Sequence, residues 1–154
     1  VAKQLAKVVN DGAYNLVIAG RESIDYNGGM VPGMLAALTN ANFVNNCIGL
    51  EVEGTNATAS REIDGGKETV STSLPLVVGG QKGLVEESDL RIPNMRGIMA
   101  ARTKPLEVVD AVASENLTEI VSYSLPAEKG DCKYVDPENV AELVDLLHNE
   151  AKAI

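Results

Sequence analysis

The pattern that decides the fold lies in residues 16–39, which read L-V-I-A-G-R-E-S-I-D-Y-N-G-G-M-V-P-G-M-L-A-A-L-T. Leu16 to Ala19 are wholly apolar, which is typical of a short strand buried on both faces of a parallel sheet. A loop rich in glycine follows, and the next apolar stretch predicts a helix from Pro32 or Gly33 to Thr39. This order predicts an α/β fold, with an open, mostly parallel sheet flanked by helices in a Rossmann-like arrangement.

The glycine-rich loop is the place where the sequence favours ligand binding. Open parallel sheets bind ligands beyond the carboxyl ends of their strands. Gly28, Gly29 and Gly33 would let the backbone approach a ligand closely, and the free N–H groups at the start of the helix would attract a phosphate. The loop matches neither G-x-G-x-x-G nor the Walker pattern, so a plain connection built on tight turns is an equal alternative.

The middle of the chain predicts an antiparallel hairpin added to this sheet. Asp64-Gly65-Gly66 tolerates the positive φ that a primed hairpin turn requires, so residues 59–63 and 68–74 should pair as antiparallel strands. Carboxylates flank this turn, and we interpret them as a solvated rim rather than an acid/base site.

The remaining elements follow from periodicity and capping signals. A helix over residues 1–10 should end at Asp11-Gly12, and the Asp136-Pro137-Glu138 sequence should cap a C-terminal helix. Another helix is expected at 96–102. The remaining strands are expected at 46–53, 57–63, 68–78 and 119–123.

Composition restricts the classes of function. The 154 residues fit one α/β domain. Thirteen basic and twenty-two acidic residues give a net charge of -9, which argues against nucleic acid and anionic membranes as partners. No apolar run is long enough for a transmembrane helix. Cys47 and Cys132 predict two reduced thiols, and the single His148 predicts a helix-surface residue, so neither a catalytic triad nor a metal site is expected.

Three segments together resemble one known family. R-E-I-D-G-G-K-E-T-V-S-T-S-L-P-L-V-V, residues 61–78, resembles the signature segment of the β subunit of electron transfer flavoproteins, with Leu76 in place of the usual alanine. Residues 16–30 resemble the family's nucleotide loop, and residues 92–108 resemble its recognition loop. The likeness covers nearly the whole chain. It implies a C-terminal portion of such a β subunit, in one domain over residues 1–154, with the N-terminal part of the subunit absent.

The resemblance implies an electron carrier subunit rather than an enzyme. In this family an α subunit holds FAD, while the β subunit binds AMP and completes a heterodimer. Electrons pass from acyl-CoA or other primary dehydrogenases, as in fatty acid oxidation, through the FAD to a quinone-linked or other acceptor. The implied location is the cytoplasm of a bacterium.

The resemblance also implies which residues bind AMP. The side chains of Asp25 and Asn27 would make polar contacts, and the backbone from Gly28 to Val31 would lie near the phosphate. The hydroxyl side chain expected at position 31 is missing, so phosphate binding would depend on backbone N–H groups. The complete set of expected cofactor-binding residues is Gly20, Ile24, Asp25, Tyr26, Asn27, Gly28, Gly29, Met30 and Val31.

The recognition loop implies a docking site for dehydrogenases. Met95 stands where the family carries an apolar anchor, at the end of a loop before the helix proper, and methionine can repack against different surfaces. Arg91 and Arg96 would steer docking onto an acidic partner, together with Arg102 and Lys104. Ile98 and Met99 are expected in the core.

Two alternatives remain open. Electron-bifurcating relatives hold a second FAD in the β subunit, in a loop with an Asp-Thr pair, and Gly28 stands here at the threonine position. A stand-alone adenine-nucleotide-binding regulatory module would share the α/β layout without electron transfer. The hairpin argues against this second alternative, because a bare nucleotide fold does not need it.

Overall fold

The computed structural model describes all 154 residues. It divides them into two compact units, Val1–Glu115 and Asn116–Ile154. The first unit holds every strand and the helices α1 to α3, and the second unit holds α4 and the π-helical turn η2. One domain over residues 1–154 stays a prediction.

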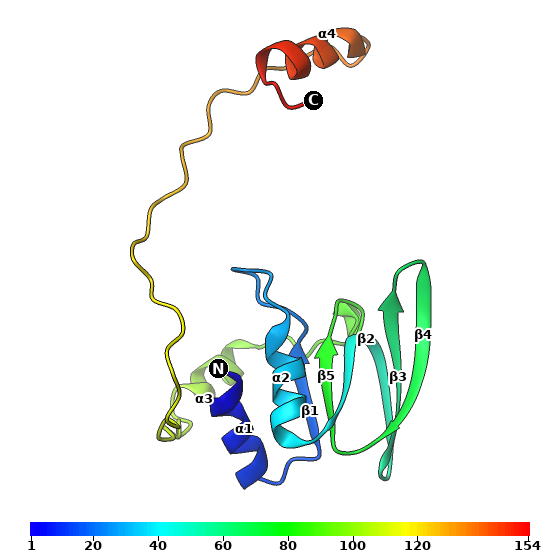
Figure 1. Ribbon diagram of the computed structural model, residues 1–154, viewed down its shortest axis with the longest axis vertical. Coiled ribbons are helices and arrows are strands. Elements are labelled where there is room, and N and C mark those ends of the chain that lie inside the picture. Colours follow the sequence, from blue (N-terminus) through cyan, green and yellow to red (C-terminus); the bar gives the residue numbers. More distant parts are fainter. The chain divides into compact units, whose positions relative to one another are not determined.

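The first unit is built on a five-stranded sheet in the order β1-β5-β2-β3-β4. Strands β1, β5 and β2 run parallel, and β3 and β4 extend the sheet as antiparallel neighbours (Figure 1). This arrangement confirms the predicted α/β fold with an added hairpin. The strands are β1 (Leu16–Gly20), β2 (Asn42–Glu53), β3 (Asn56–Ile63), β4 (Gly66–Ser73) and β5 (Leu76–Gly80).

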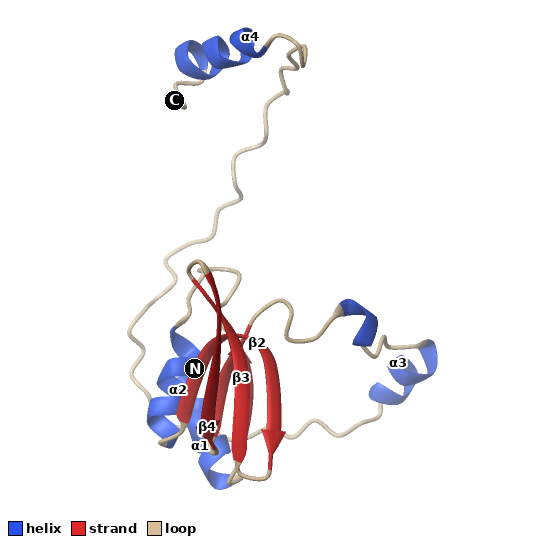
Figure 2. Cartoon of the chain, turned by 90° about the vertical axis from the view of Figure 1, so that its right-hand side faces the viewer, coloured by secondary structure: helices blue, strands red, loops and turns tan.

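Two helices cover one face of the parallel strands, as Figure 2 shows with the sheet seen nearly edge-on. They are α1 (Ala2–Asp11) and α2 (Met30–Thr39). Helix α1 turns Ala2 and Ala6 inward, and α2 turns Leu35 and Ala36 inward. Both helices were expected, although α2 begins earlier than predicted and the left-handed residue after α1 is Ala13 (φ 49°) rather than Gly12.

Strand β5 lies at the centre of the core. Leu76, Val77 and Val78 are each at most 1% exposed. Val77 faces the helices and packs with Ala6, Leu35 and Ala36, whereas Leu76 and Val78 pack with residues of β2 and β3. A wholly apolar strand is needed here because parallel strands on both sides pair with its backbone, and packed side chains cover both of its faces.

The prediction of a doubly buried strand is wrong for β1. It forms an edge of the sheet, pairing only with β5. Its faces are also incompletely covered, since no residue of β1 is fully buried and the side chain of Ile18 is 58% exposed. The same apolar pattern therefore describes a central strand and an edge strand.

The hairpin forms in the predicted place. Ile63 pairs with Gly66, so Asp64 and Gly65 alone close the turn. The turn is not of the primed kind, because only Gly65 has a positive φ, of 83°, whereas a primed turn also requires one at the first central residue. The strand predicted at 68–78 is two strands. Pro75 separates them because it has no N–H to donate, and β4 pairs with β3 while β5 pairs with β1 and β2.

Replacing Gly65 by valine should lower the free energy of unfolding by about 1 to 3 kcal/mol, the range for a side chain forced into a left-handed backbone. The expected cause is backbone strain alone, since a Cβ at this position would have nothing within 4 Å. Gly66→Val is the matched control, because Gly66 is equally open but its φ is ordinary. Urea unfolding measures both variants, and equal losses would contradict the role of φ.

The second unit has little regular structure. It contains α4 (Val140–Asp145) and η2 (Leu146–Glu150). Asn139 caps α4 by accepting from the Glu142 N–H at 3.3 Å, so the prediction of Asp136 as the cap is wrong. Asp136 instead accepts from the Glu138 N–H at 2.9 Å and shapes the turn before the helix.

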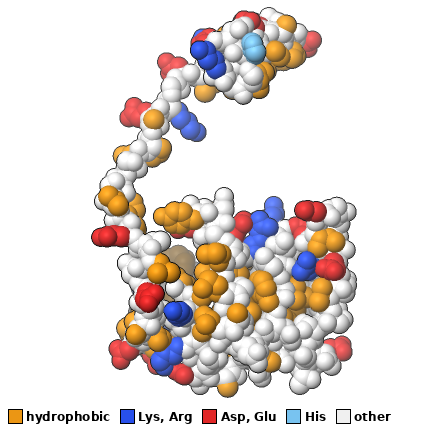
Figure 3. Space-filling model, viewed as in Figure 1, with side chains coloured by type: hydrophobic (Ala, Val, Ile, Leu, Met, Phe, Trp, Pro, Cys, Tyr) orange, Lys and Arg blue, Asp and Glu red, His pale blue; other side chains and the backbone are white.

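The strand predicted at 119–123 is not formed. Its apolar side chains are exposed, among them Val121 and Tyr123, and apolar side chains along this segment are visible in Figure 3. A strand also needs a neighbour to pair with its backbone, and this segment pairs with none.

Both cysteines are free, Cys47 buried in the first unit and Cys132 exposed in the second. His148 is exposed on η2. The longest helices fall well short of the length and apolar content needed to cross a bilayer.

Candidate functional site

The glycine-rich loop connects the carboxyl end of β1 to the start of α2, as the sequence predicted. Two backbone hydrogen bonds shape it, from the Arg21 N–H to the Gly80 carbonyl and from the Ser23 N–H to the Gly28 carbonyl, both 3.1 Å. Asn27 takes a left-handed conformation, with φ 51°, which asparagine tolerates better than most residues. The loop therefore turns back on itself before the helix begins.

The start of α2 offers free backbone donors. Its N-cap is Gly29, which has no side chain to accept from the first N–H groups of the helix. Met30 is the first helical residue, earlier than the predicted Pro32 or Gly33, so the N–H groups of Met30 and Val31 belong to the first turn. These donors, together with the positive end of the helix dipole, favour an anion.

Asp25 is one of three charged side chains in the loop, with Arg21 and Glu22. A hydrogen bond from the Ser23 hydroxyl is the main reason why the pKa of this carboxyl lies below its ordinary value, and the Tyr26 N–H adds to the effect. Asp25 is therefore ionised at neutral pH and can accept hydrogen bonds only. Such a carboxylate suits a hydroxyl group, as on a ribose, better than a phosphate.

The other expected contacts are solvent-exposed. Ile24, Tyr26 and Met30 are 97%, 82% and 74% exposed. The residues from Gly20 to Val31 thus occupy the end of β1, the loop and the first turn of α2.

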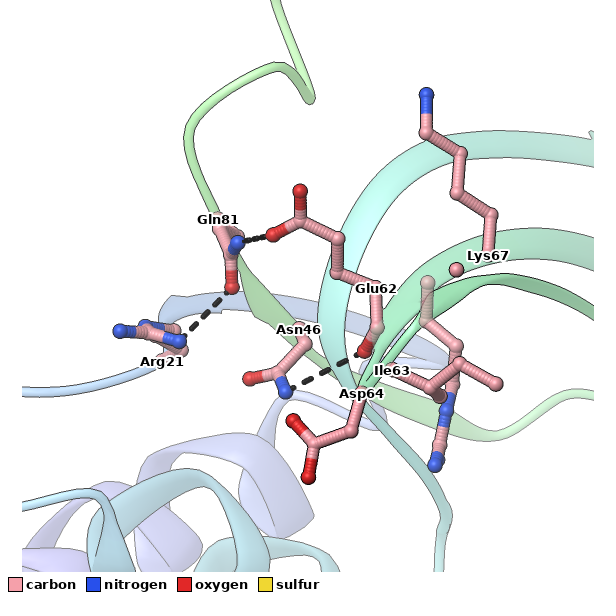
Figure 4. A pocket seen from close by; sticks show the side chains of 9 residues that line it. Arg21, Asn46, Glu62, Ile63, Asp64, Lys67 and Gln81 are labelled. Carbon is pink, nitrogen blue, oxygen red and sulfur yellow. Dashed lines mark hydrogen bonds between the residues drawn. The ribbon is translucent and has the colours of Figure 1, made fainter.

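A cavity of about 650 Å³ lies beside this loop, and sequence reasoning did not predict it. It opens beyond the carboxyl ends of β1 and β5, under the tip of the hairpin (Figure 4). The residues that line it are Arg21, Asn46, Arg61, Glu62, Ile63, Asp64, Gly66, Lys67 and Gln81.

Hydrogen bonds connect the elements around the cavity. The Arg21 guanidinium donates to the Gln81 side-chain oxygen at 2.9 Å, and the Gln81 amide nitrogen donates to the Glu62 carboxylate. Asn46 donates to the Glu62 carbonyl at 3.5 Å from a left-handed backbone (φ 56°), where β2 shifts its register against β5. Arg21 and Gln81 are neighbours because Gly20 and Gly80, the residues before them, are paired at the ends of two parallel strands, a register that no sequence signal gave.

Two of the carboxylates near the hairpin turn, Glu62 and Glu68, have structural partners. Glu68 pairs with the Arg61 guanidinium at 2.9 Å, and Glu62 accepts from Gln81. The chain contains no group of three His, Cys, Asp or Glu side chains that could hold a metal ion.

The expected docking residues lie in the segment that leads into α3 (Met95–Ala101), after the 3-10 turn η1 (Glu87–Asp89). Asn94 caps this helix by accepting from the Gly97 N–H at 2.8 Å. Met95 is therefore the first helical residue, and it is 73% exposed. The side chains of Arg91 and Arg96 are exposed beside it.

The prediction that Ile98 and Met99 lie in the core is wrong. They are 43% and 54% exposed, and α3 buries none of its residues. Helical spacing of apolar residues identifies an apolar face but does not say what covers it.

Comparison with known proteins agrees with this geometry. A family model described as the electron transfer flavoprotein domain matches residues 1–114. The chain is 34% identical to the electron transfer flavoprotein subunit beta of Bacillus subtilis (strain 168), covering 100% of this chain and 63% of that protein. The subunits beta of Syntrophomonas wolfei and Bradyrhizobium diazoefficiens are 34% and 36% identical, each over 98% of this chain and 60% of their own length. The chain thus spans between 60% and 63% of these relatives.

Three strands of the sheet are parallel, and a glycine-rich loop leads from the first of them into a helix without a side-chain cap. This arrangement defines an α/β protein of the Rossmann-like class. Within this class the family match and the relatives are decisive. The chain belongs to the electron transfer flavoprotein family, and its relatives there are β subunits.

Proposed function

We propose that this chain is part of the β subunit of a heterodimeric electron transfer flavoprotein that binds AMP and docks primary dehydrogenases. An α subunit carries the FAD, which supplies the redox chemistry. Electrons from acyl-CoA or other dehydrogenases pass through this FAD to a quinone-linked or other acceptor. The β subunit itself breaks and forms no bonds, and it works in the cytoplasm of a bacterium.

The start of α2 is the observation that carries the nucleotide part of this proposal. Its first-turn N–H groups have no side-chain cap, and they stand beyond the carboxyl end of a parallel strand. Both features favour a phosphate group. The backbone of Gly28 to Val31 would hold the AMP phosphate.

The loop residues also fit the rest of AMP. The ionised Asp25 can accept from a ribose hydroxyl, and Asn27 can donate and accept. A Cβ at Gly28 or Gly29 would make only an ordinary contact of 3.4 Å with the Ser23 hydroxyl or the Arg21 carbonyl, so glycine here serves the close approach of a ligand rather than the turn itself. Gly20, Ile24, Tyr26 and Met30 complete the proposed contact surface.

Docking is assigned to Met95, Arg91 and Arg96. An exposed, unbranched apolar side chain at a capped helix start can enter a pocket on a partner. The two arginines carry positive charge in a chain whose net charge is -9, and they would orient an acidic partner.

Expression of the full-length subunit with its α subunit tests the proposal. We expect a yellow heterodimer that contains one FAD and one AMP, counted from its absorbance spectrum and from nucleotides released on denaturation. Two flavins per heterodimer would instead favour an electron-bifurcating protein. A colourless monomer would favour a stand-alone nucleotide-binding module, and either result would contradict our proposal.

A further inference from the structure

The side chain of Gln81 forms hydrogen bonds to both the hairpin and the glycine-rich loop. Its side-chain oxygen accepts from Arg21 at 2.9 Å, and its side-chain nitrogen donates to Glu62 (Figure 4). Arg21 is the first residue of the loop, whereas Glu62 lies one residue before the end of β3. A single amide thus connects two elements that are about forty residues apart in the sequence.

The chemistry of the three side chains fixes the orientation of this amide. A guanidinium has only donors, and an ionised carboxylate has only acceptors. Between them an amide satisfies both neighbours in one orientation, with oxygen toward Arg21 and nitrogen toward Glu62. Each neighbour therefore holds the amide in the orientation that the other requires, and the two contacts should strengthen each other.

Backbone hydrogen bonds also hold Gln81 and Arg21 in place. The Gln81 N–H donates to the Cys47 carbonyl at 2.9 Å, and the Arg21 N–H donates to the Gly80 carbonyl at 3.1 Å. Cys47 is fully buried. The hairpin tip and the loop beyond Arg21, in contrast, are both exposed.

We propose that Gln81 is a positioning residue that couples the β3–β4 hairpin to the glycine-rich loop, so that loss of the Glu62 contact on the hairpin changes the affinity of the loop for its ligand. Loss of the Glu62 contact releases one end of the amide. The Arg21 guanidinium then keeps its pairing with Glu22 at 2.8 Å but loses a fixed acceptor in Gln81. Coupling of this kind is reciprocal, so a ligand in the loop should also stabilise the hairpin tip. The consequence for AMP rests on the proposed function, whereas the mechanical coupling does not.

Amide hydrogen exchange of this chain measures the coupling without any nucleotide. The reporters are the N–H groups of Arg21 and Ser23, which are hydrogen-bonded within the loop region. Glu62→Ala should speed their exchange by about fivefold, because the loop opens locally more often. Glu62→Gln should stay near the rate of the original protein, because its side-chain oxygen can still accept from Gln81.

Two controls distinguish coupling from general damage. Lys67→Ala removes another side chain that lines the cavity, but one that makes no ion pair, and should leave the reporters unchanged. Glu62→Ala added to Gln81→Ala should have no further effect, because the connection is already broken. Loop exchange that is unchanged in Glu62→Ala, or additive effects in the double variant, would overturn the proposal.

A second measurement addresses the functional consequence. In the full-length heterodimer, Glu62→Ala should weaken AMP binding several-fold, measured by calorimetry, and Glu62→Gln should restore it. If the original heterodimer binds no AMP, the proposed function fails, while the exchange rates still decide the coupling. Equal AMP affinity in the two Glu62 variants, with binding intact, would restrict the coupling to the free chain and overturn its role in ligand affinity.

Discussion

Replacing Leu35 by alanine should remove about 2 to 5 kcal/mol from the free energy of unfolding, the cost of truncating a well-packed core leucine. Leu35 is 1% exposed, and it packs with Ala6 and Val77 between α2 and the sheet. Its neighbours include small alanines, which cannot extend into the space that the lost methyl groups leave. The cavity should therefore persist, and the loss should fall in the upper part of the range.

Leu38→Ala is the matched control, because Leu38 lies on the same helix but is 44% exposed. It has the same change in helix propensity, so the difference between the two variants isolates burial. Urea unfolding followed by circular dichroism gives both free energies. Similar losses would contradict the packing of α2 on β5.

The Leu35 variant also bears on the site. Leu35 lies little more than one turn after the start of α2, so it fixes the end of the helix that faces the glycine-rich loop. Weaker packing there should let the first-turn N–H groups move. We therefore expect the N-terminal half of α2 to lose more hydrogen-exchange protection than β5 does.

Much of the fold could be predicted because local chemistry decided it. The wholly apolar run that became β1 could be recognised as a strand, and Asp64-Gly65 could be recognised as a turn. Which strands pair with one another could not be predicted in the same way. The run from 68 to 78 is continuous in pattern, yet its halves pair with different strands, and only Pro75 marks the division.

Exposure was the least predictable property. Ile18, Ile98 and Met99 have the spacing of core residues, and all three are exposed. Periodicity reports that one face of an element is apolar, whereas burial depends on whether another element lies against that face. In the same way, residues 119–123 form no strand because no neighbouring strand pairs with them.

The candidate site was predictable where it is continuous in sequence. The glycine-rich loop from Gly20 to Val31 is such a segment. The cavity beside it is not, because Arg21, Asn46, Glu62 and Gln81 come from four separate segments. Asn46 in particular reaches the cavity because its own backbone is left-handed, at a point where the register of β2 shifts. No local sequence motif predicts such a shift.

Replacing Met95 by alanine in the full-length heterodimer should weaken docking of the primary dehydrogenase by about 1 to 3 kcal/mol, the loss expected for an apolar interface anchor. Met95 is 73% exposed, so its truncation removes little packing within the chain. Its position is nonetheless well defined, because the Asn94 cap fixes the first turn of α3. Folding, melting temperature and flavin content should therefore stay unchanged.

Rates of flavin reduction, measured against dehydrogenase concentration, separate docking from electron transfer itself. The half-saturating concentration should rise by roughly 5- to 150-fold, which corresponds to that free energy, while the rate at saturation stays the same. Met34→Ala is the matched control, since Met34 is a 47% exposed methionine on α2, outside the docking segment. Charge reversal at Arg96 should weaken docking more at low salt than at high salt, because screening removes steering by exposed charges. If Met95→Ala instead lowered the melting temperature and left the reduction kinetics unchanged, Met95 would be a packing residue and the docking segment would lie elsewhere.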